Sequence, residues 1–185
     1  MILTTDRLIL RDFTENDLRR ITEYRSDERY LRYYPEDSTY ECSQRFVHLV
    51  MGWSSETPRR KFQLAILRAS DRLLIGNCGI RTTSERDMEA EFGCELDPHF
   101  WQQGYATEAG KAMLRHTFGT LGMHRVWSRT IAENRSAAKV ALRLGMRLEG
   151  CLRQSTFIRG RWWDNHVYAI LEQEWRTEYQ DQRRC

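Results

Sequence analysis

The spacing of apolar residues at the start of the chain predicts an amphipathic strand over 4–13, with Leu8 and Leu10 on one face. Further apolar runs of strand length lie between turn-forming residues, at 62–67, 73–80, 89–96, 126–131, 146–152 and 163–171. Between and after these strands, apolar residues recur at helical spacing. The predicted helices cover 17–25, 41–51, 105–121 and 135–144, followed by a polar helical tail after 172.

Capping residues support three of these helices. Thr14-x-x-Asp17 and Ser38-x-x-Glu41 are capping boxes for the first two, and Asn134 is an N-cap residue before the fourth. The resulting order, β-α-α-β-β-β-α-β-α-β-β, combines a meander with βαβ units. It predicts a mixed α/β fold with a central sheet of six to seven strands and helices on both faces.

Composition favours one soluble domain. A chain of 185 residues with 41% hydrophobic residues and only 3 Pro predicts a single domain over 1–175 and a polar tail over 176–185. No apolar run approaches the roughly 20 residues that span a bilayer. Five cysteines without a Cys-x-x-Cys pair predict free thiols in the cytoplasm, and the scattered histidines predict no metal site.

The net charge of +3 is unevenly distributed. Acidic residues concentrate in 85–97, whereas basic residues dominate 108–164. One interpretation is a set of solvated faces. The other is an acidic face for a cationic substrate beside a basic face for a phosphorylated ligand. The net charge is too modest to indicate nucleic-acid binding.

The most informative segment is 97–109. A strand ends at Asp97-Pro98, and Gly104-x-Ala106 then begins a helix. Small residues at a helix start let several backbone N–H groups turn outward, and the helix dipole adds partial positive charge there. A side chain at position 104 would hold a phosphate away from the backbone. The segment therefore predicts a phosphate-binding loop.

Three ordered blocks of the sequence carry a resemblance to a known family: 90–96 with 101–109, Asn134 with 140–150, and 3–11. Together they resemble the GNAT superfamily of N-acetyltransferases, in its RimJ/RimL-like branch. The superfamily pattern is Arg/Gln-x-x-Gly-x-Gly/Ala, and here Trp101 stands where Arg or Gln is usual. The resemblance extends over 3–171.

The resemblance implies acetyl-CoA as co-substrate and an amine as acceptor. It also implies that the strands at 89–96 and 126–131 splay, and that the pantetheine amides lie in the gap. The pyrophosphate then meets the N–H groups around 103–107. The cofactor-binding residues implied in this way are Glu95, Leu96, Gln102, Gln103, Gly104, Tyr105, Ala106, Thr107, Asn134 and Lys139.

The catalytic candidates are Glu91, Asn134 and Ser136. Glu91 shares one strand face with Glu95, and is interpreted either as the general base that deprotonates the acceptor ammonium or as a salt-bridged surface residue. Some relatives carry a serine and an acidic residue at two positions that are Ala137 and Thr156 here. This departure leaves open which residues act as general acid and general base.

The acceptor is the least determined part. The resemblance favours a protein N-terminal α-amine, including that of a ribosomal protein. The alternatives are a small amine, such as an aminoglycoside or polyamine, and a catalytically silent CoA-binding module. An aromatic group in 30–34, 53 and 162–163 is interpreted as core packing or as an acceptor pocket. A homodimer is compatible with this branch.

Overall fold

The computed structural model describes residues 1–34, 39–82 and 88–181. These residues form eight strands in one sheet, in the order β1-β2-β3-β4-β5-β6-β8-β7. The strands are β1 (Ile2–Thr4), β2 (Leu8–Asp12), β3 (Lys61–Arg68), β4 (Leu74–Arg81), β5 (Glu89–Leu96), β6 (Arg125–Ile131), β7 (Arg147–Ile158) and β8 (Arg161–Leu171). The α-helices are α1 (Leu18–Arg25), α2 (Glu28–Leu31), α3 (Tyr40–Ser54), α4 (Tyr105–Gly119), α5 (Arg135–Arg143) and α6 (Glu172–Asp181), with short 3-10 helices at Glu15–Asp17 and Pro98–Phe100.

The predicted mixed α/β fold is confirmed, with one strand more than expected. The strand predicted over 4–13 is β2, which is shorter, and the residues before it form β1. A turn between β1 and β2 is closed by the Thr5 N–H donating to the Leu8 carbonyl (3.0 Å). The four-residue helix α2 was not predicted, since one turn is too short to show a helical period. β7 and β8 form a longer hairpin than their apolar runs indicate.

Two of the predicted caps are present. Thr14 and Asp17 form the capping box, which begins a 3-10 turn leading into α1. The Asn134 carboxamide accepts from the Ala137 N–H (3.1 Å). Ser38 lies outside the described residues, and the hydroxyl of Thr39 accepts from the Cys42 N–H (3.2 Å) to cap α3.

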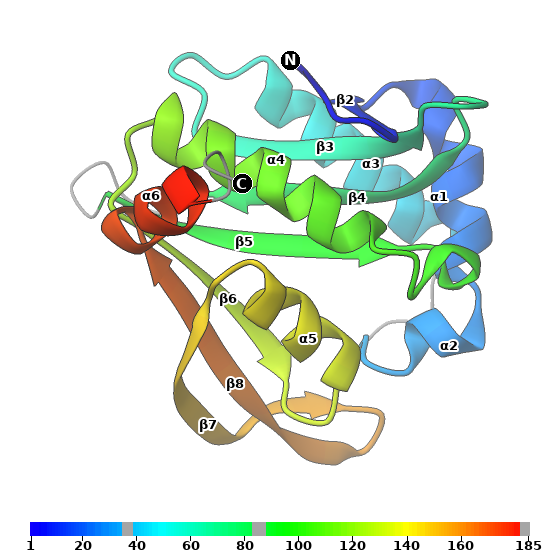
Figure 1. Ribbon diagram of the computed structural model, residues 1–185. Coiled ribbons are helices and arrows are strands. Elements are labelled where there is room, and N and C mark those ends of the chain that lie inside the picture. Colours follow the sequence, from blue (N-terminus) through cyan, green and yellow to red (C-terminus); the bar gives the residue numbers. More distant parts are fainter. Residues whose placement is uncertain (35–38, 83–87, 182–185) are drawn as a thin grey trace.

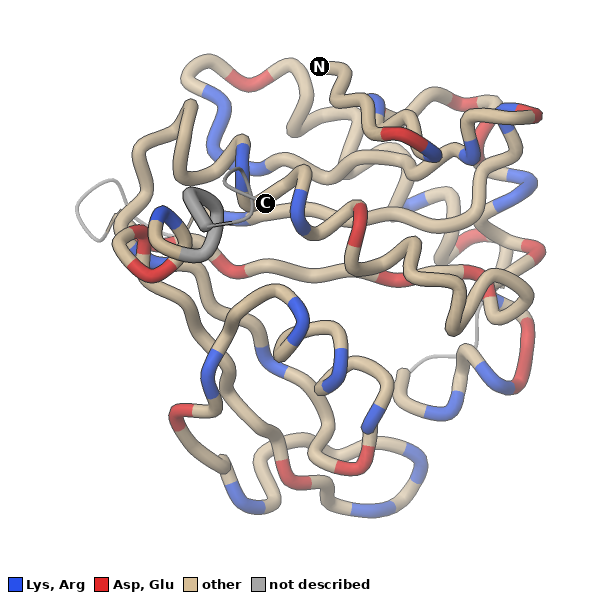
Figure 2. Tube along the Cα trace, in the orientation of Figure 1, with Lys and Arg blue, Asp and Glu red and all other residues tan. Residues whose placement is uncertain are grey.

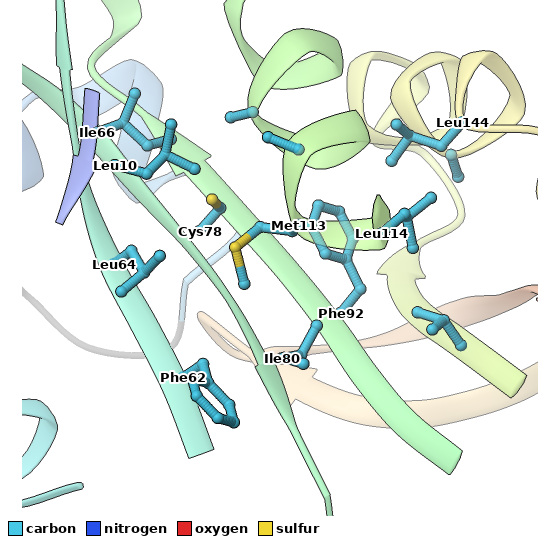
Figure 3. Close-up of a cluster of buried hydrophobic side chains, with 14 of the residues drawn as sticks. Leu10, Phe62, Leu64, Ile66, Cys78, Ile80, Phe92, Met113, Leu114 and Leu144 are labelled. Carbon is cyan, nitrogen blue, oxygen red and sulfur yellow. The ribbon is translucent and has the colours of Figure 1, made fainter. Parts of the chain in front are cut away.

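Helices cover both faces of the sheet (Figure 1). The helices α4 and α5 pack on one face over the larger core, where Met113 of α4 lies among side chains of β2, β3, β4 and β5 (Figure 3). The helices α1, α2 and α3 pack a second core on the other face. Trp175 of α6 packs against Phe118 of α4, with ring centroids 6.0 Å apart. No described helix is long and apolar enough to cross a membrane.

Candidate active site

The strands β5 and β6 pair over only part of their length. They are parallel neighbours, and their register covers Glu89–Glu91 against Arg125–Trp127. Beyond these residues β5 continues along β4, and β6 continues along β8. The two strands therefore diverge, as Figure 1 shows, and the predicted splay is confirmed.

Backbone polar groups of β5 face the gap. The Asp97 N–H donates to the Ile75 carbonyl of β4 (2.9 Å). Since the backbone groups of alternate residues point to the same side of a strand, those of Cys94 and Leu96 point away from β4, toward β6. The Leu96 carbonyl accepts from the Trp101 indole N–H (2.8 Å). The groups left for a ligand are the Cys94 N–H and carbonyl and the Leu96 N–H.

On the opposite side of the gap, backbone polar groups of β6 also point into it. The Ala132 N–H donates to the Asp164 carbonyl of β8 (2.9 Å), so by alternation Arg129 and Ile131 direct their backbone groups toward β5. The Ile131 carbonyl accepts from the Asn134 N–H (2.9 Å), which leaves the Ile131 N–H and both backbone groups of Arg129 for a ligand. Backbone groups that lack a strand partner need another hydrogen-bonding partner. An extended ligand that carries amides matches this gap in the way an added strand would.

The loop before α4 brings the predicted phosphate-binding residues together. Gly104 is the N-cap of α4 and has φ +83°, which favours glycine. The first hydrogen bond of the helix is donated by Glu108 to the Gly104 carbonyl (3.0 Å), so the N–H groups of 105–107 have no acceptor within the helix. Gln102 also has a positive φ, and the Gln103 carboxamide donates to the His99 carbonyl (3.1 Å).

The helix α5 begins next to the end of β6. Asn134 is its N-cap, and Ser136 is exposed in its first turn. Lys139 lies four residues from both Arg135 and Arg143, and all three are exposed, so the cations share one stripe of the helix. Figure 2 shows basic residues spaced along α5. These positions are compatible with the predicted roles of Asn134, Ser136 and Lys139, which stay predictions.

Glu91 lies at the point where β5 and β6 separate. It is the last residue of β5 in register with β6, opposite Trp127. Its carboxylate faces Arg81 of β4 at 3.5 Å, and its side chain is 28% exposed. A carboxylate at a strand crossing, in reach of solvent, can accept a proton from an amine, so Glu91 remains the candidate base.

The comparison with known sequences decides the family. Residues 7–147 match the family described as acetyltransferase (GNAT) domain. The chain belongs to the GNAT acetyltransferase family. It is an N-acetyltransferase, and the GNAT family uses acetyl-CoA. Its relatives include the uncharacterized N-acetyltransferase YnaD of Bacillus subtilis (strain 168), with 34% identity over 95% of this chain and 99% of YnaD.

A further relative is the [ribosomal protein uS5]-alanine N-acetyltransferase of Escherichia coli (strain K12), 22% identical over 94% of this chain and 92% of that protein. Among solved structures, a GNAT acetyltransferase from Bacillus anthracis superposes with a TM-score of 0.83 at 29% identity, covering 94% of this chain and 99% of the other. The Vibrio cholerae spermidine N-acetyltransferase in complex with CoA and spermine superposes with a TM-score of 0.78 at 21% identity, covering 92% and 99%.

Glu95 occupies a different place in this GNAT fold from the one predicted. Its carboxylate accepts hydrogen bonds from the Tyr24 hydroxyl (2.8 Å), the Tyr30 hydroxyl (2.5 Å) and the Arg25 guanidinium (2.6 and 2.9 Å). The Asn77 carboxamide also donates to it. Burial acts to raise the pKa of Glu95, but the Arg25 charge and these hydrogen bonds outweigh burial and lower it.

These contacts have a consequence for the predicted cofactor contact of Glu95. The side chain is committed to α1 and α2, and the backbone of Glu95 lies in register with Asn77 of β4. Neither part faces the gap. Glu95 therefore holds two helices against the end of β5, and we do not retain it among the residues proposed to contact the cofactor.

The helix α2 and the residues after it connect the two arms of the gap. Tyr30 bonds to Glu95 of β5 and stacks on Tyr34, with ring centroids 4.4 Å apart. The ring of Tyr33 packs edge-on against Trp163 of β8 (5.8 Å), and its hydroxyl donates to the Glu133 carbonyl (3.3 Å). These four aromatic residues of the predicted group gather at the open end of the gap.

The other two aromatic residues of that group lie elsewhere. Trp53 packs in the core of α1 and α3. Trp162 is exposed on the β7–β8 hairpin beside Phe157, with ring centroids 5.2 Å apart. The sequence did not indicate the bridging position of α2, because it depends on contacts between residues that are up to 130 positions apart, such as Tyr33 and Trp163.

The Cys94 thiol is a poor candidate for a covalent acetyl carrier. Burial raises the pKa of the Cys94 thiol to about 12, so the thiol stays protonated and is a poor nucleophile. The described residues contain no group of three or more His, Cys, Asp or Glu side chains that could hold a metal ion.

Proposed function

We propose that this N-acetyltransferase acetylates the α-amine at a protein N-terminus, by direct transfer from acetyl-CoA in a ternary complex. The divergence of β5 and β6 carries this proposal, because it combines a gap lined with backbone hydrogen-bonding groups with Glu91 at its apex. The kinship with the uS5-alanine N-acetyltransferase over nearly the full length supports the choice of acceptor. We further propose a single catalytic domain over 1–175 in the cytoplasm, where the free cysteines 42, 78, 94 and 151 are stable.

The residues present fit acetyl-CoA. The Cys94 and Leu96 backbone groups would align the pantetheine arm, the N–H groups of 103–107 would hold the pyrophosphate, and Lys139 would contribute positive charge beside it. Acetyl-CoA supplies a reactive thioester when bound. Glu91, directly or through a water, accepts the proton of the acceptor ammonium, and Asn134 and Ser136 are the candidate polar groups near the leaving sulfur.

The charges on the acceptor face favour a singly charged amine over a polyamine. The face of β5 toward α1 carries three glutamates, and each has an arginine partner: Glu89 with Arg125 (2.9 Å), Glu91 with Arg81 (3.5 Å) and Glu95 with Arg25 (2.6 Å). A polyamine would have to compete with these arginines for several carboxylates. A protein α-amine needs only one, and Glu91 is the least tightly held.

The choice of acceptor is tested by measuring free CoA thiol. The protein is incubated with acetyl-CoA and, separately, with peptides beginning with Ala or Ser, with spermidine and with an aminoglycoside. We expect turnover with the peptides and little with the polyamine. Turnover with spermidine or the aminoglycoside but with none of the peptides would contradict the proposed acceptor.

The role of Glu91 is tested by Glu91→Gln. Removal of a general base lowers kcat by about 10²- to 10⁴-fold, and CoA affinity should stay unchanged because Glu91 does not face the loop before α4. The matched control is Glu89→Gln, which changes an arginine-paired glutamate two residues away on the same face and should retain near-normal kcat. Turnover by Glu91→Gln at the normal rate would exclude Glu91 as the base.

A further inference from the structure

The opening residues of the chain contact the loop before α4, although they lie about 100 positions away. Arg7, in the turn between β1 and β2, donates through its guanidinium to the Glu108 carboxylate (2.6 and 2.7 Å) and to the Gln103 carbonyl (3.2 Å). The Arg7 N–H and the Thr5 hydroxyl donate to the other oxygen of Glu108 (3.0 and 2.6 Å). The guanidinium also lies 4.6 Å from the centre of the Tyr105 ring.

The contact with Gln103 fixes the direction of one peptide group. The carbonyl of residue 103 and the N–H of residue 104 belong to the same planar unit and point in opposite directions. Because Arg7 binds the Gln103 carbonyl, the Gly104 N–H points away from the β1–β2 turn. Glycine, with φ +83° here, places little steric restriction on rotation of its peptide groups. The arginine therefore supplies an orientation that the loop sequence does not.

The contact with Glu108 balances a charge. Glu108 lies in the first turn of α4, close to the N–H groups that would meet a pyrophosphate. An uncompensated carboxylate at this point would repel an anion. Burial acts to raise the pKa of Glu108, but hydrogen bonds from Thr5 and Arg7 lower it, so it is ionised and paired. The positive end of the helix dipole then remains effective for a ligand.

We propose that Arg7 is a positioning residue for the binding of the CoA pyrophosphate. It acts through the Gln103–Gly104 peptide and through Glu108, without contacting the cofactor. The proposal rests on the proposed role of the loop in acetyl-CoA binding. It also gives a function to the first block of the sequence, which the proposed reaction leaves unused.

The test compares ligands with and without the pyrophosphate in Arg7→Ala. Isothermal titration gives Kd for CoA, and steady-state kinetics give KM for S-acetylpantetheine, which lacks the pyrophosphate. We expect about tenfold weaker binding of CoA, the size of a lost charge-assisted hydrogen bond, and an unchanged KM for S-acetylpantetheine. Arg19→Ala, which breaks a surface ion pair with Glu23 within α1, is the control for net charge and should leave both values unchanged.

A second variant distinguishes positioning from direct attraction of the phosphate. Arg7→Lys keeps the charge but puts one nitrogen in place of the three that contact Glu108 and the Gln103 carbonyl, so positioning predicts that it weakens CoA binding nearly as much as Arg7→Ala. Wild-type affinity in Arg7→Lys, or in Arg7→Ala, would overturn the proposal. An equal loss with CoA and S-acetylpantetheine would also overturn it, since that result indicates general disruption of the fold.

The experiment also separates this proposal from the proposed acceptor. A wild-type protein that binds CoA but acetylates none of the peptides would contradict the acceptor. The effect of Arg7→Ala on CoA binding would still support or refute positioning. A wild-type protein that does not bind CoA would refute both.

Discussion

At the scale of single residues, Gly104 links the sequence most directly to a geometric requirement. Its φ of +83° is strained for a residue with a β-carbon, and such a carbon would lie 3.4 Å from the Arg7 guanidinium. In Gly104→Val the loop must shift, so we expect CoA affinity to fall at least tenfold by isothermal titration, a loss of about 1.4 kcal/mol, while the circular dichroism spectrum stays native.

Gly122 provides the matched control for this substitution. It also has a positive φ (+65°), but it lies beyond the other end of α4 and a β-carbon there meets nothing. Gly122→Val should therefore reproduce the backbone strain without affecting CoA binding. Unchanged CoA affinity in Gly104→Val would show that the loop does not hold the pyrophosphate.

Residue-level prediction from the sequence succeeds where the reason is local. Gly104 and the cap at Asn134 follow from backbone conformation and nearby N–H groups, which short sequence patterns record. The partners of Glu95 and Glu108 do not, because apart from Asn77 they come from residues at least 65 positions away along the chain. The function of Trp101, which departs from the superfamily pattern, becomes clear only from its bond to the Leu96 carbonyl.

At the scale of secondary-structure elements, one carboxylate fastens α1 and α2 to β5. Glu95→Ala would leave the Arg25 guanidinium, whose side chain is 13% exposed, without its carboxylate partner. Breaking a buried ion pair on one side costs about 3–5 kcal/mol, and we expect a loss of this size in urea denaturation. Because the folded-state pKa of Glu95 is lowered, its contribution is present at neutral pH and is lost as pH falls through that pKa.

The control for Glu95 is an exposed glutamate that also has arginine partners. Glu23 pairs with Arg19 and Arg20 on the surface of α1, and its side chain is 45% exposed. Glu23→Ala should change the free energy of unfolding by less than about 1 kcal/mol. An equally small effect of Glu95→Ala would show that the helices are held by apolar packing alone.

The sequence predicts the bounds of single strands and helices better than it predicts how the strands pair. The range 89–96 is the same in the sequence and in β5, because an apolar run there ends at Asp97-Pro98. The β7–β8 hairpin is longer than its apolar runs because exposed residues such as Arg153 and Gln154 continue β7 without an apolar face. The partial pairing of β5 with β6 is a relation between two strands that neither strand's own sequence specifies.

At the scale of the whole molecule, the basic and the acidic parts of the sequence have separate explanations. On α5 the cations form one exposed stripe, whereas Arg125 and Arg161 pair with glutamates. The described acidic residues of the segment 85–97, Glu89, Glu91, Glu95 and Asp97, each pair with an arginine from another element. The ion pairs between side chains therefore predict more about ligands than net charge does. These pairs exist only in the folded chain.

Whole-molecule stability should depend on pH through His116 of α4. Burial, and then the charge of Arg59, lower the pKa of His116, whose Nε2 is buried without a hydrogen-bond partner among the described residues. Its ring packs edge-on against Phe62 (5.4 Å). The folded state therefore favours the neutral ring, and the unfolded chain binds more protons as pH falls below about 6.5.

Stability contributed by the neutral ring is thus present above pH 6.5 and declines below it. Urea denaturation between pH 7.5 and 5 should show this decline, and His116→Leu should flatten it because the titrating group is gone. Carboxylates with lowered pKa values, such as Asp12 and Glu95, produce their own loss only at lower pH, where they become protonated. His116→Leu removes one titrating group, the buried imidazole. If the decline in stability is unchanged in this variant, the pH dependence comes from another group.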